Sequence, residues 1–313
     1  MSAIRLCKDV MKQQLQLHSG QGWAPRACRD RAGRQAPQTI GRFALQSLHQ
    51  ELAAYPKPGL VSPVDCGSHR DMDAALFFRS LFSLRRYFCD VALAGMHSAS
   101  FALLKQLGIS AEERMLKATQ GVNTHRGAIF NLGLLAAAAG HLHDADQSLQ
   151  KDALRDVVMN RWGAAIRQHG QSLPKLSHGS LVASRYGVGG ALHEAACGFP
   201  HLFDVGLPTL QKSLERGVDP NSAAVQCLFS LMEVLPDTNL LYRGGDSGLR
   251  FAHESARSFL AEGGVHRIGW QEHAVDIHRQ FVDLNLSPGG SADLLAATLF
   301  VNRLQSWQVS LPG

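Results

Sequence analysis

Residues 121–140 read GVNTHRGAIFNLGLLAAAAG, and this stretch decides the fold class. From Gly127 to Gly140 the apolar side chains recur at helical spacing, and the four alanines at 136–139 are typical of a helix that packs closely against its neighbours. Residues 121–127 form a glycine-bounded loop that leads directly into this helix. The free N–H groups and the dipole of a helix start favour an anion. The stretch therefore predicts a packed helix with a phosphate-type anion site at its beginning.

Apolar stripes at helical spacing recur through the chain from about residue 39 onward. Their members are Ala44, Leu45, Leu48, Leu52, Phe77, Leu81, Leu84, Phe88, Val225, Leu228, Phe229, Met232, Leu235, Ile277, Phe281 and Leu284. The segment Ser110–Glu113, read SAEE, has the pattern of a capping box and predicts that the helix before the loop begins at Ser110. Pro220 predicts another helix start. Because sustained strand-type alternation is missing, we expect an all-α fold, with one multi-helix domain over residues 38–313 and functional loops at the helix ends.

The net charge of the chain is concentrated in residues 1–37. This segment holds seven Lys or Arg against two Asp, whereas the rest of the chain holds 24 basic and 24 acidic side chains. A nucleic-acid-binding surface on the folded domain therefore loses its main support. The segment is rich in Arg and lacks the apolar core of a signal peptide. We expect a disordered extension or a misassigned start, in preference to an organellar transit peptide.

The spacing of the cysteines and the length of the apolar runs indicate in which cellular compartment the protein is expected. Six cysteines are scattered without paired spacing, which argues against a zinc ribbon or a disulfide framework and suits a reducing cytoplasm. No apolar run approaches the ~18 to 20 residues needed to cross a bilayer. We therefore expect a cytoplasmic protein that binds neither membrane nor nucleic acid, with a homodimer as one option for its assembly.

Three further segments share the composition of the loop at 121–127 and also adjoin predicted helices. They are PKPGLVS at 56–62 with its continuation GSHRDMD at 67–73, GGALHEAACGFP at 189–200, and NLSPGGSADLLA at 285–296. In order and spacing, the four segments resemble the triphosphoribosyl-dephospho-CoA synthase family. The family pattern has a Pro-Lys-Pro-Gly-Leu-Val loop, a Gly-x-His-x-Asp-Met segment, a Gly-Val-Asn-Thr-His-Lys-Gly core and a Ser-Pro-Gly-Gly-x-Ala-Asp-Leu-Leu-Ala segment. The resemblance spans roughly residues 39 to 305.

The resemblance implies a pentosyltransferase that uses ATP and 3′-dephospho-CoA. In the family reaction, the ribose 2′-hydroxyl of dephospho-CoA replaces adenine at the anomeric carbon of ATP, and the triphosphate stays intact. The product is the prosthetic-group precursor for the acyl carrier subunit of malonate decarboxylase, which we prefer, or of citrate lyase. An oxocarbenium-like transition state calls for carboxylates near the ribose, a base for the acceptor proton and a donor to adenine. Mg²⁺ is expected to accompany ATP.

The resemblance also nominates site residues, all inside the matching segments. The expected catalytic residues are Glu194 as general base, Asp71 and His125. The expected phosphate- and substrate-binding residues are Lys57, His69, Arg70, Asn123, Thr124 and Arg126, with the backbone N–H groups of Gly121, Gly127, Gly289 and Gly290. The expected ligands of Mg²⁺ or ribose are Asp71, Asp73 and Asp293. Prolines on both sides of Lys57 are expected to stiffen its loop and to present its side chain outward.

Several of these residues also have a purely structural interpretation. Acidic residues in the first turn of a helix are favoured by the helix dipole alone. Ser68 and Ser291 are suited to N-caps. His69 and His125 are equally compatible with buried imidazoles bonded to carbonyl groups.

The chain departs from the family pattern at two positions. Arg126 stands where the family usually has Lys, which keeps the charge but changes the donor geometry. Leu192 stands where a family Arg is expected, which removes a phosphate contact.

Two alternative functions also remain open. One is an all-α metal-dependent nucleotide phosphohydrolase, suggested by His141, His143 and Asp144, and the other is an inactive helical partner protein, suggested by Leu192.

Overall fold

The computed structural model describes residues 31–172, 182 and 185–309. The chain divides into two compact units, residues 1–35 and 36–313, and the four matched segments all lie in the second. No β-strand occurs within the described ranges, which confirms the predicted all-α fold.

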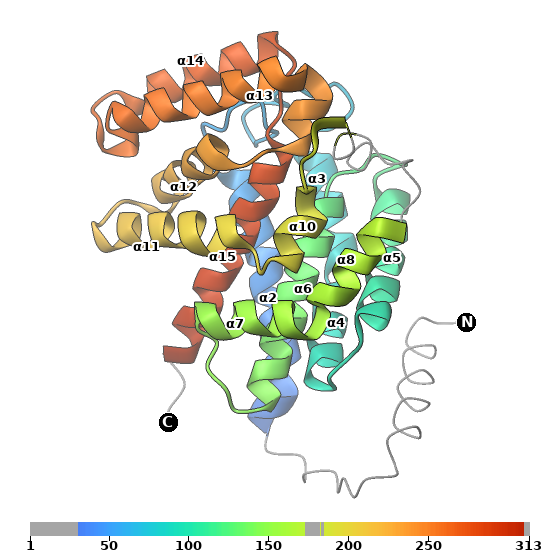
Figure 1. The fold of residues 1–313 in the computed structure, drawn as a ribbon. Coiled ribbons are helices and arrows are strands. Elements are labelled where there is room, and N and C mark those ends of the chain that lie inside the picture. The colour runs from blue at the N-terminus through green and yellow to red at the C-terminus, as the bar shows by residue number, and fades with distance from the viewer. Residues whose placement is uncertain (1–30, 173–181, 183–184, 310–313) are drawn as a thin grey trace, which may run out of the picture. The chain divides into compact units, whose positions relative to one another are not determined.

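Apart from residues 54–73 between α2 and α3, the described connections between helices are short (Figure 1). The first part of the chain contains α2 (Arg31–Ala53), α3 (Ala74–Leu84), α4 (Tyr87–Met96), α5 (Phe101–Ala118), α6 (Arg126–Asp144), α7 (Lys151–Val157), the π-helix η1 (Val158–Gly163) and α8 (Ala164–Ser172). The second part contains α10 (Gly190–Ala196), the π-helix η2 (Leu202–Gly206), α11 (Leu207–Glu215), α12 (Pro220–Val234), α13 (Thr238–Ala261), the 3₁₀ helix η3 (Gly264–His266), α14 (Trp270–Asp283) and α15 (Gly289–Val309).

Helix α6 is buried along most of its length and packs against α4, α5 and α15. Its alanines Ala136–Ala139 are fully buried. A side-chain carbon at Gly95 of α4 would overlap the carbonyl oxygen of Ala137, and one at Gly140 would overlap the carbonyl oxygen of Ala92. The backbones of α4 and α6 are therefore in direct contact, and the close packing predicted from the small residues of this helix is confirmed.

The predicted start of α5 at Ser110 is wrong. The helix begins at Phe101, nine residues earlier, and Ser100 caps it by accepting a hydrogen bond from the Leu103 N–H. Gly108 does not interrupt the helix, and a side-chain carbon there would meet only ordinary contacts. The sequence Ser110–Glu113 has the composition of a capping box, but it lies inside a helix whose apolar face was already established upstream.

Two other helix starts bear on the sequence analysis. Helix α12 begins at Pro220, as predicted, and Asp219 caps it. Helix α2 begins at Arg31 and runs through Pro37, so it extends into the segment interpreted as an extension. Residues 1–30 of that segment lie outside the described residues.

The C-terminal end of α2 and the N-terminal ends of α3, α6 and α15 lie at the same end of the helical unit (Figure 1). Three of the four matched segments are the connections at this end. None of the helices in the described part of the chain is long and apolar enough to cross a membrane.

Candidate active site

The loop at 56–73 packs directly on the connection between α14 and α15. Gly59 has a positive φ of 64°, and a side-chain carbon there would overlap the carbonyl oxygen of Leu286. The Ser68 hydroxyl lies 3.1 Å from the carbonyl oxygen of Phe281 and 2.6 Å from that of Leu286. Ser68 is therefore not a helix cap, and Asp73 caps α3 instead. Because Gly59 and Ser68 both contact this connection, two segments more than 200 residues apart in sequence form one surface.

The loop at 121–127 joins the same region from α6. A side-chain carbon at Gly127 would overlap the Asp293 carboxylate of α15. The Thr124 hydroxyl donates to the Ser80 hydroxyl of α3 over 2.6 Å. Three of the four matched segments therefore meet, as the sequence predicts for parts of a single site.

Three acidic side chains, Glu51, Asp237 and Asp293, form a group that we name the carboxylate cluster. Desolvation raises the pKa of Asp293 well above its ordinary value, and the nearby carboxylates of Glu51 and Asp237 raise it further. Burial also raises the pKa of Asp237. Desolvation and like charge both disfavour the ionised form, so Asp293 keeps its proton to a higher pH than an ordinary carboxyl group. Asp293 itself is only partly covered in the structure.

Asp237, the residue before α13, binds the N-terminal end of α15 through its carboxylate. One carboxylate oxygen accepts hydrogen bonds from the N–H and the hydroxyl of Ser291, at 2.8 and 3.0 Å. The other accepts from the Asn239 N–H and caps α13. The N–H of Gly290 also faces this carboxylate. The Asp237 carboxylate thus lies where the N–H groups around Gly289 and Gly290 were expected to hold phosphate. The prediction that Ser291 is an N-cap is wrong, because Ser291 lies within α15.

Lys57 points inward, so the prediction that its side chain faces outward is wrong. Only 1% of the residue is exposed. Its ammonium group lies 2.6 Å from both the carbonyl oxygen and the carboxylate of Glu51. Its own carbonyl oxygen accepts a hydrogen bond from His278 at 2.8 Å. The buried carboxylate of Glu51 determines where the ammonium group lies, because an unpaired buried charge is costly.

Arg243 of α13 connects the loop at 56–73 to the connection before α15. One terminal nitrogen donates to the carbonyl oxygens of Ser68 and Asn285, at 3.0 and 3.1 Å, and to the Asn285 side chain at 2.9 Å. The other donates to Nδ1 of His69 at 3.1 Å. We name Arg243, Ser68, His69, Asn285 and Ser287 the arginine cluster. Burial lowers the pKa of Arg243, but a guanidinium keeps its charge in proteins.

The contacts of His69 determine its protonation state. Since arginine only donates, Nδ1 must accept, and Nε2 carries the proton and donates to the Ser287 hydroxyl at 3.0 Å. Burial and then the charge of Arg243 lower the pKa of His69 to about 4. His69 is therefore neutral at physiological pH, and its ring joins the two loops.

His125 is buried and also neutral. Its Nδ1 lies 2.6 Å from the Ser80 hydroxyl, and its ring forms a T-shaped contact with the ring of Phe77. Burial, and secondarily the charge of Lys57, lower the pKa of His125 to about 4. Its Nε2 is buried and has no hydrogen-bond partner among the described residues. A buried polar atom of this kind calls for an explanation, and the predicted catalytic role of His125 remains a prediction.

The other predicted residues of loop 121–127 lie nearer the surface. Arg126 is exposed and forms an ion pair with Glu112, with 2.6 Å between Nε and the carboxylate. The Asn123 side chain accepts a hydrogen bond from the Arg126 N–H, the first N–H of α6, at 3.2 Å. Gly121 has a positive φ of 92° and is exposed. Arg70, on the neighbouring loop, is exposed and has no ion-pair partner within the described ranges.

Glu194 lies in α10 and is already engaged. Its two carboxylate oxygens accept from the backbone N–H and the ring Nδ1 of His201, at 2.9 and 2.7 Å. The hydrogen bond with Glu194 is the main reason that the pKa of His201 is raised. The segment approaches the converging loops at its start, where Gly190 faces Thr238. For Glu194 to act as a base, His201 would have to give up one of these bonds.

The predicted Mg²⁺ ligands are not assembled into one group. Asp73 accepts from the Leu76 N–H at 2.7 Å as the cap of α3, Asp71 is exposed, and Asp293 belongs to the carboxylate cluster. Within the described ranges, no group of three or more His, Cys, Asp or Glu side chains is arranged to hold a metal ion. The rings of His141 and His143, which suggested the alternative phosphohydrolase, contact Arg161 and Trp307.

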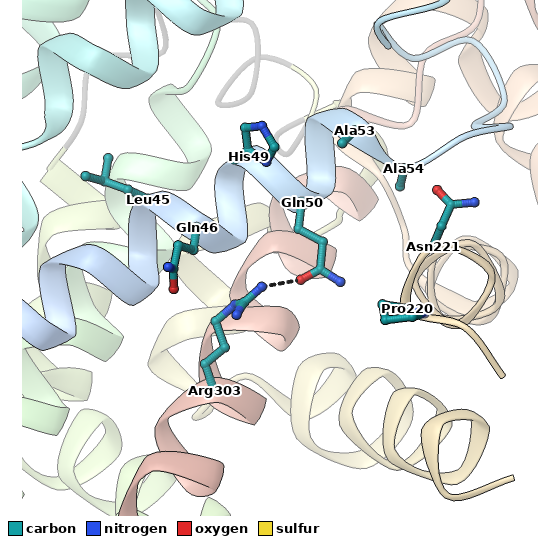
Figure 2. Close-up of a pocket in the computed structure, with 9 residues that line it drawn as sticks. All are labelled: Leu45, Gln46, His49, Gln50, Ala53, Ala54, Pro220, Asn221 and Arg303. Carbon is teal, nitrogen blue, oxygen red and sulfur yellow. Dashed lines mark hydrogen bonds between the residues drawn. The ribbon is translucent and has the colours of Figure 1, made fainter. Parts of the chain in front are cut away.

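A groove of about 630 Å³ lies apart from this site, between α2, α12 and α15 (Figure 2). Gln50 accepts a hydrogen bond from Arg303 across it, at 2.6 Å. At about 100° per residue, Gln46 and His49 project from one side of α2 and Glu51 from roughly the opposite side. The groove is therefore on the other side of α2 from the carboxylate cluster.

Comparisons with known proteins agree with the matched segments. The sequence model of the ATP:dephospho-CoA triphosphoribosyl transferase family matches residues 37–311. A relative from Acinetobacter calcoaceticus, named probable 2-(5''-triphosphoribosyl)-3'-dephosphocoenzyme-A synthase, is 42% identical over 263 residues, which cover 84% of this chain and 90% of the relative. A relative of the same name from Pseudomonas aeruginosa is 39% identical over 274 residues, covering 85% and 91%.

A third relative, from Pectobacterium atrosepticum, is named 2-(5''-triphosphoribosyl)-3'-dephosphocoenzyme-A synthase. It is 39% identical over 266 residues, which cover 83% of this chain and 87% of the relative. No solved structure matches the chain. The chain belongs to the ATP:dephospho-CoA triphosphoribosyl transferase family.

Three residues of the site were missed in the sequence: Glu51, Asp237 and Arg243. For Arg243 a signal was present, because the Arg-Gly-Gly run at 243–245 has the composition of the other loops. Asp237 directly precedes a helix, so its role as an N-cap could be predicted from the sequence. Its contact with α15 could not be predicted in this way. Nothing distinguishes Glu51 from an ordinary acidic residue near the end of a helix.

Proposed function

We propose that this chain transfers the 5-triphosphoribosyl group of ATP to the ribose 2′-hydroxyl of 3′-dephospho-CoA and releases adenine. The observation that carries the proposal is the family match over residues 37–311. Three of the four segments through which the sequence resembles the family meet at one end of the helical unit, at Gly59 and Leu286 and at Gly127 and Asp293.

The reaction exchanges one bond at the anomeric carbon for another. The acceptor oxygen forms a bond to this carbon as the bond to the adenine nitrogen breaks, and the acceptor proton passes to a base. Positive charge develops on the ribose, and preorganised carboxylates stabilise it. Within the carboxylate cluster, Glu51 and Asp237 suit this role, because Glu51 pairs with the Lys57 ammonium group and Asp237 accepts hydrogen bonds on both carboxylate oxygens. Asp293, whose pKa is raised, is suited to donate a proton to departing adenine.

The triphosphate has to be held without being cleaved. Mg²⁺ is proposed to arrive with ATP, and an Mg²⁺ ion bound by one or two carboxylates and by phosphate oxygens does not need a group of three acidic residues. Asp71, exposed beside His69, suits one such ligand. When bound, the ion would neutralise phosphate charge.

The pathway and cellular context are also proposals. The product would serve malonate decarboxylase, or citrate lyase as the second option. A cytoplasmic location agrees with the use of ATP and with the free thiols of Cys66, Cys89, Cys197 and Cys227. A homodimer remains one option for assembly.

Incubation of the full chain with ATP, dephospho-CoA and Mg²⁺ tests the proposal, with chromatography of free adenine as the readout. Adenine is expected to appear only when dephospho-CoA is present. A β,γ-imido analogue of ATP should also release adenine, because no phosphate bond breaks. Inorganic phosphate without adenine would instead support the phosphohydrolase, and bound ATP without any product would support the inactive partner.

A further inference from the structure

A triphosphate carries several negative charges, so its site needs cations that are not already neutralised. Two of the predicted cations have internal partners. Lys57 is buried in an ion pair with Glu51, and Arg126 is paired with Glu112. Arg243 differs, because the groups that it contacts are carbonyl oxygens, an amide and a neutral imidazole. No carboxylate of the described residues forms an ion pair with it, and the exposed Asp71 is close enough only for its charge to raise the pKa of Arg243.

We propose that Arg243 binds the triphosphate of the donor nucleotide, with Arg70, which follows His69 in the chain and is exposed, as a second cation. This inference rests on the proposed function and names the residue that holds the uncleaved end of ATP. Phosphate oxygens would replace some of the neutral acceptors of the guanidinium. Charge-assisted, forked hydrogen bonds to phosphate are stronger than the bonds that they replace.

The position of Arg243 suits this role. Helix α13 is interrupted two residues later, where Gly245 has the non-helical angles φ 60° and ψ −159°. The side chain of Arg243 reaches the loop that carries Arg70 and Asp71 through the carbonyl oxygen of Ser68 and the ring of His69. It thus lies at the junction of two connections instead of on a regular helix surface.

The arrangement of charge along the site also fits the donor. His69 of the arginine cluster contacts Ser287, which lies two residues before α15, and Asp293 of the carboxylate cluster lies in the second turn of that helix. From Ser287 to Asp293 the chain covers at most about 13 Å, taking about 3.4 Å per extended residue and 1.5 Å per helical residue. A ribose 5′-triphosphate can span this interval. Its negative end would then face the guanidinium, and its developing positive charge would face the carboxylates.

Two variants of Arg243 test the inference in the full chain. R243Q removes the charge, and R243K keeps the charge but loses the fork. The control is R250Q, which removes the same charge from an exposed position on the same helix. Inorganic tripolyphosphate is the probe, with its binding measured by calorimetry, and the rate of adenine release is measured while ATP and dephospho-CoA are varied separately.

R243Q is expected to weaken tripolyphosphate binding and to raise the KM for ATP by at least about tenfold, the loss of one charged hydrogen bond. The KM for dephospho-CoA should change less than about twofold, R243K should recover part of the loss, and R250Q should match the unmodified chain. Selective loss toward ATP separates binding from a purely structural role, which would change both KM values. Circular dichroism checks that the variants are folded, and R243K carries the test if R243Q is not.

Tripolyphosphate affinities that stay unchanged in both Arg243 variants would overturn the inference, even if adenine release establishes the transferase. Equal losses toward both substrates would also overturn it and leave Arg243 as a structural link between the loops. If the unmodified chain released no adenine but bound tripolyphosphate through Arg243, the proposed reaction would fail and the anion site would stand. The two proposals therefore fail separately.

Discussion

Replacement of Lys57 by methionine tests whether this lysine supports the site from inside or binds substrate. The ammonium group lies 2.6 Å from the Glu51 carboxylate, and the side chains are 1% and 8% exposed. In K57M, Glu51 would remain as a buried carboxylate without its partner, near Asp293 and Asp237, whose carboxyl groups are already hard to ionise. Removing one partner of a buried ion pair costs about 3–5 kcal/mol of unfolding free energy, a large part of the ~5–15 kcal/mol available to a folded domain.

The cost should be recovered in part when the other charge is also removed. E51Q alone leaves the Lys57 ammonium unpaired and is expected to destabilise by a similar amount. The double variant should then be more stable than the sum of the single effects predicts, by about 1–3 kcal/mol. Urea unfolding followed by circular dichroism gives these three free energies.

One result would refute this reasoning. K57M with a free energy of unfolding within about 0.5 kcal/mol of the unmodified chain, the range of an ordinary surface change, would show that the buried pair is not structural. If such a variant also failed to release adenine, Lys57 would be a substrate-binding residue, as first predicted from its loop. A large coupling energy in the double variant would exclude that outcome.

Three further predictions concern the neighbouring residues. G127A is expected to lose adenine release and about 1–3 kcal/mol of stability, because the new methyl group overlaps Asp293; G108A, its control in a roomy helix position, should be unchanged or up to about 1 kcal/mol more stable. For Asp293 the raised pKa means that its contribution to stability is present while the carboxyl is protonated and is lost as pH rises through the folded pKa. D293N should therefore become the more stable form as pH rises and lose that advantage at acidic pH, as measured by urea unfolding at several pH values. For His201 the raised pKa contributes stability that is fully present below the unfolded-state pKa and is lost as pH rises through the folded-state pKa. E194Q should lower the pKa of His201, as measured by an NMR titration. A pKa of His201 that does not change in E194Q would contradict its pairing with Glu194.

The fold class was predictable because helical periodicity and small residues are local properties of the chain. The stretch Ala136–Ala139 indicates a closely packed helix, and Gly95 and Gly140 show why. Helix boundaries were less predictable. Ser110 has the right neighbours for a cap, yet Ser100 is the cap, because the choice depends on how far the upstream turns are stabilised by packing.

The candidate site was predictable as a set of segments but not as a set of contacts. The matched sequences identify the segments that contain Gly59, Gly127 and Asp293, which the structure brings together. The direction of a side chain such as Lys57 depends on a partner, Glu51, that no local pattern marks. Predicted roles that rest on a residue type alone, such as a phosphate-binding lysine, are therefore the least secure.

The sequence by itself determined the all-α class, the family and the segments that carry the family motifs, since these follow from periodicity and from motifs that are contiguous in the chain. Only the tertiary structure decided which charges are already paired. Burial makes an isolated charge costly, so Lys57 turns inward to Glu51 and Asp237 occupies the start of α15. Arg243, which packing places at the junction of two loops, has neutral hydrogen-bond partners, and for this reason we propose it as the cation that binds phosphate.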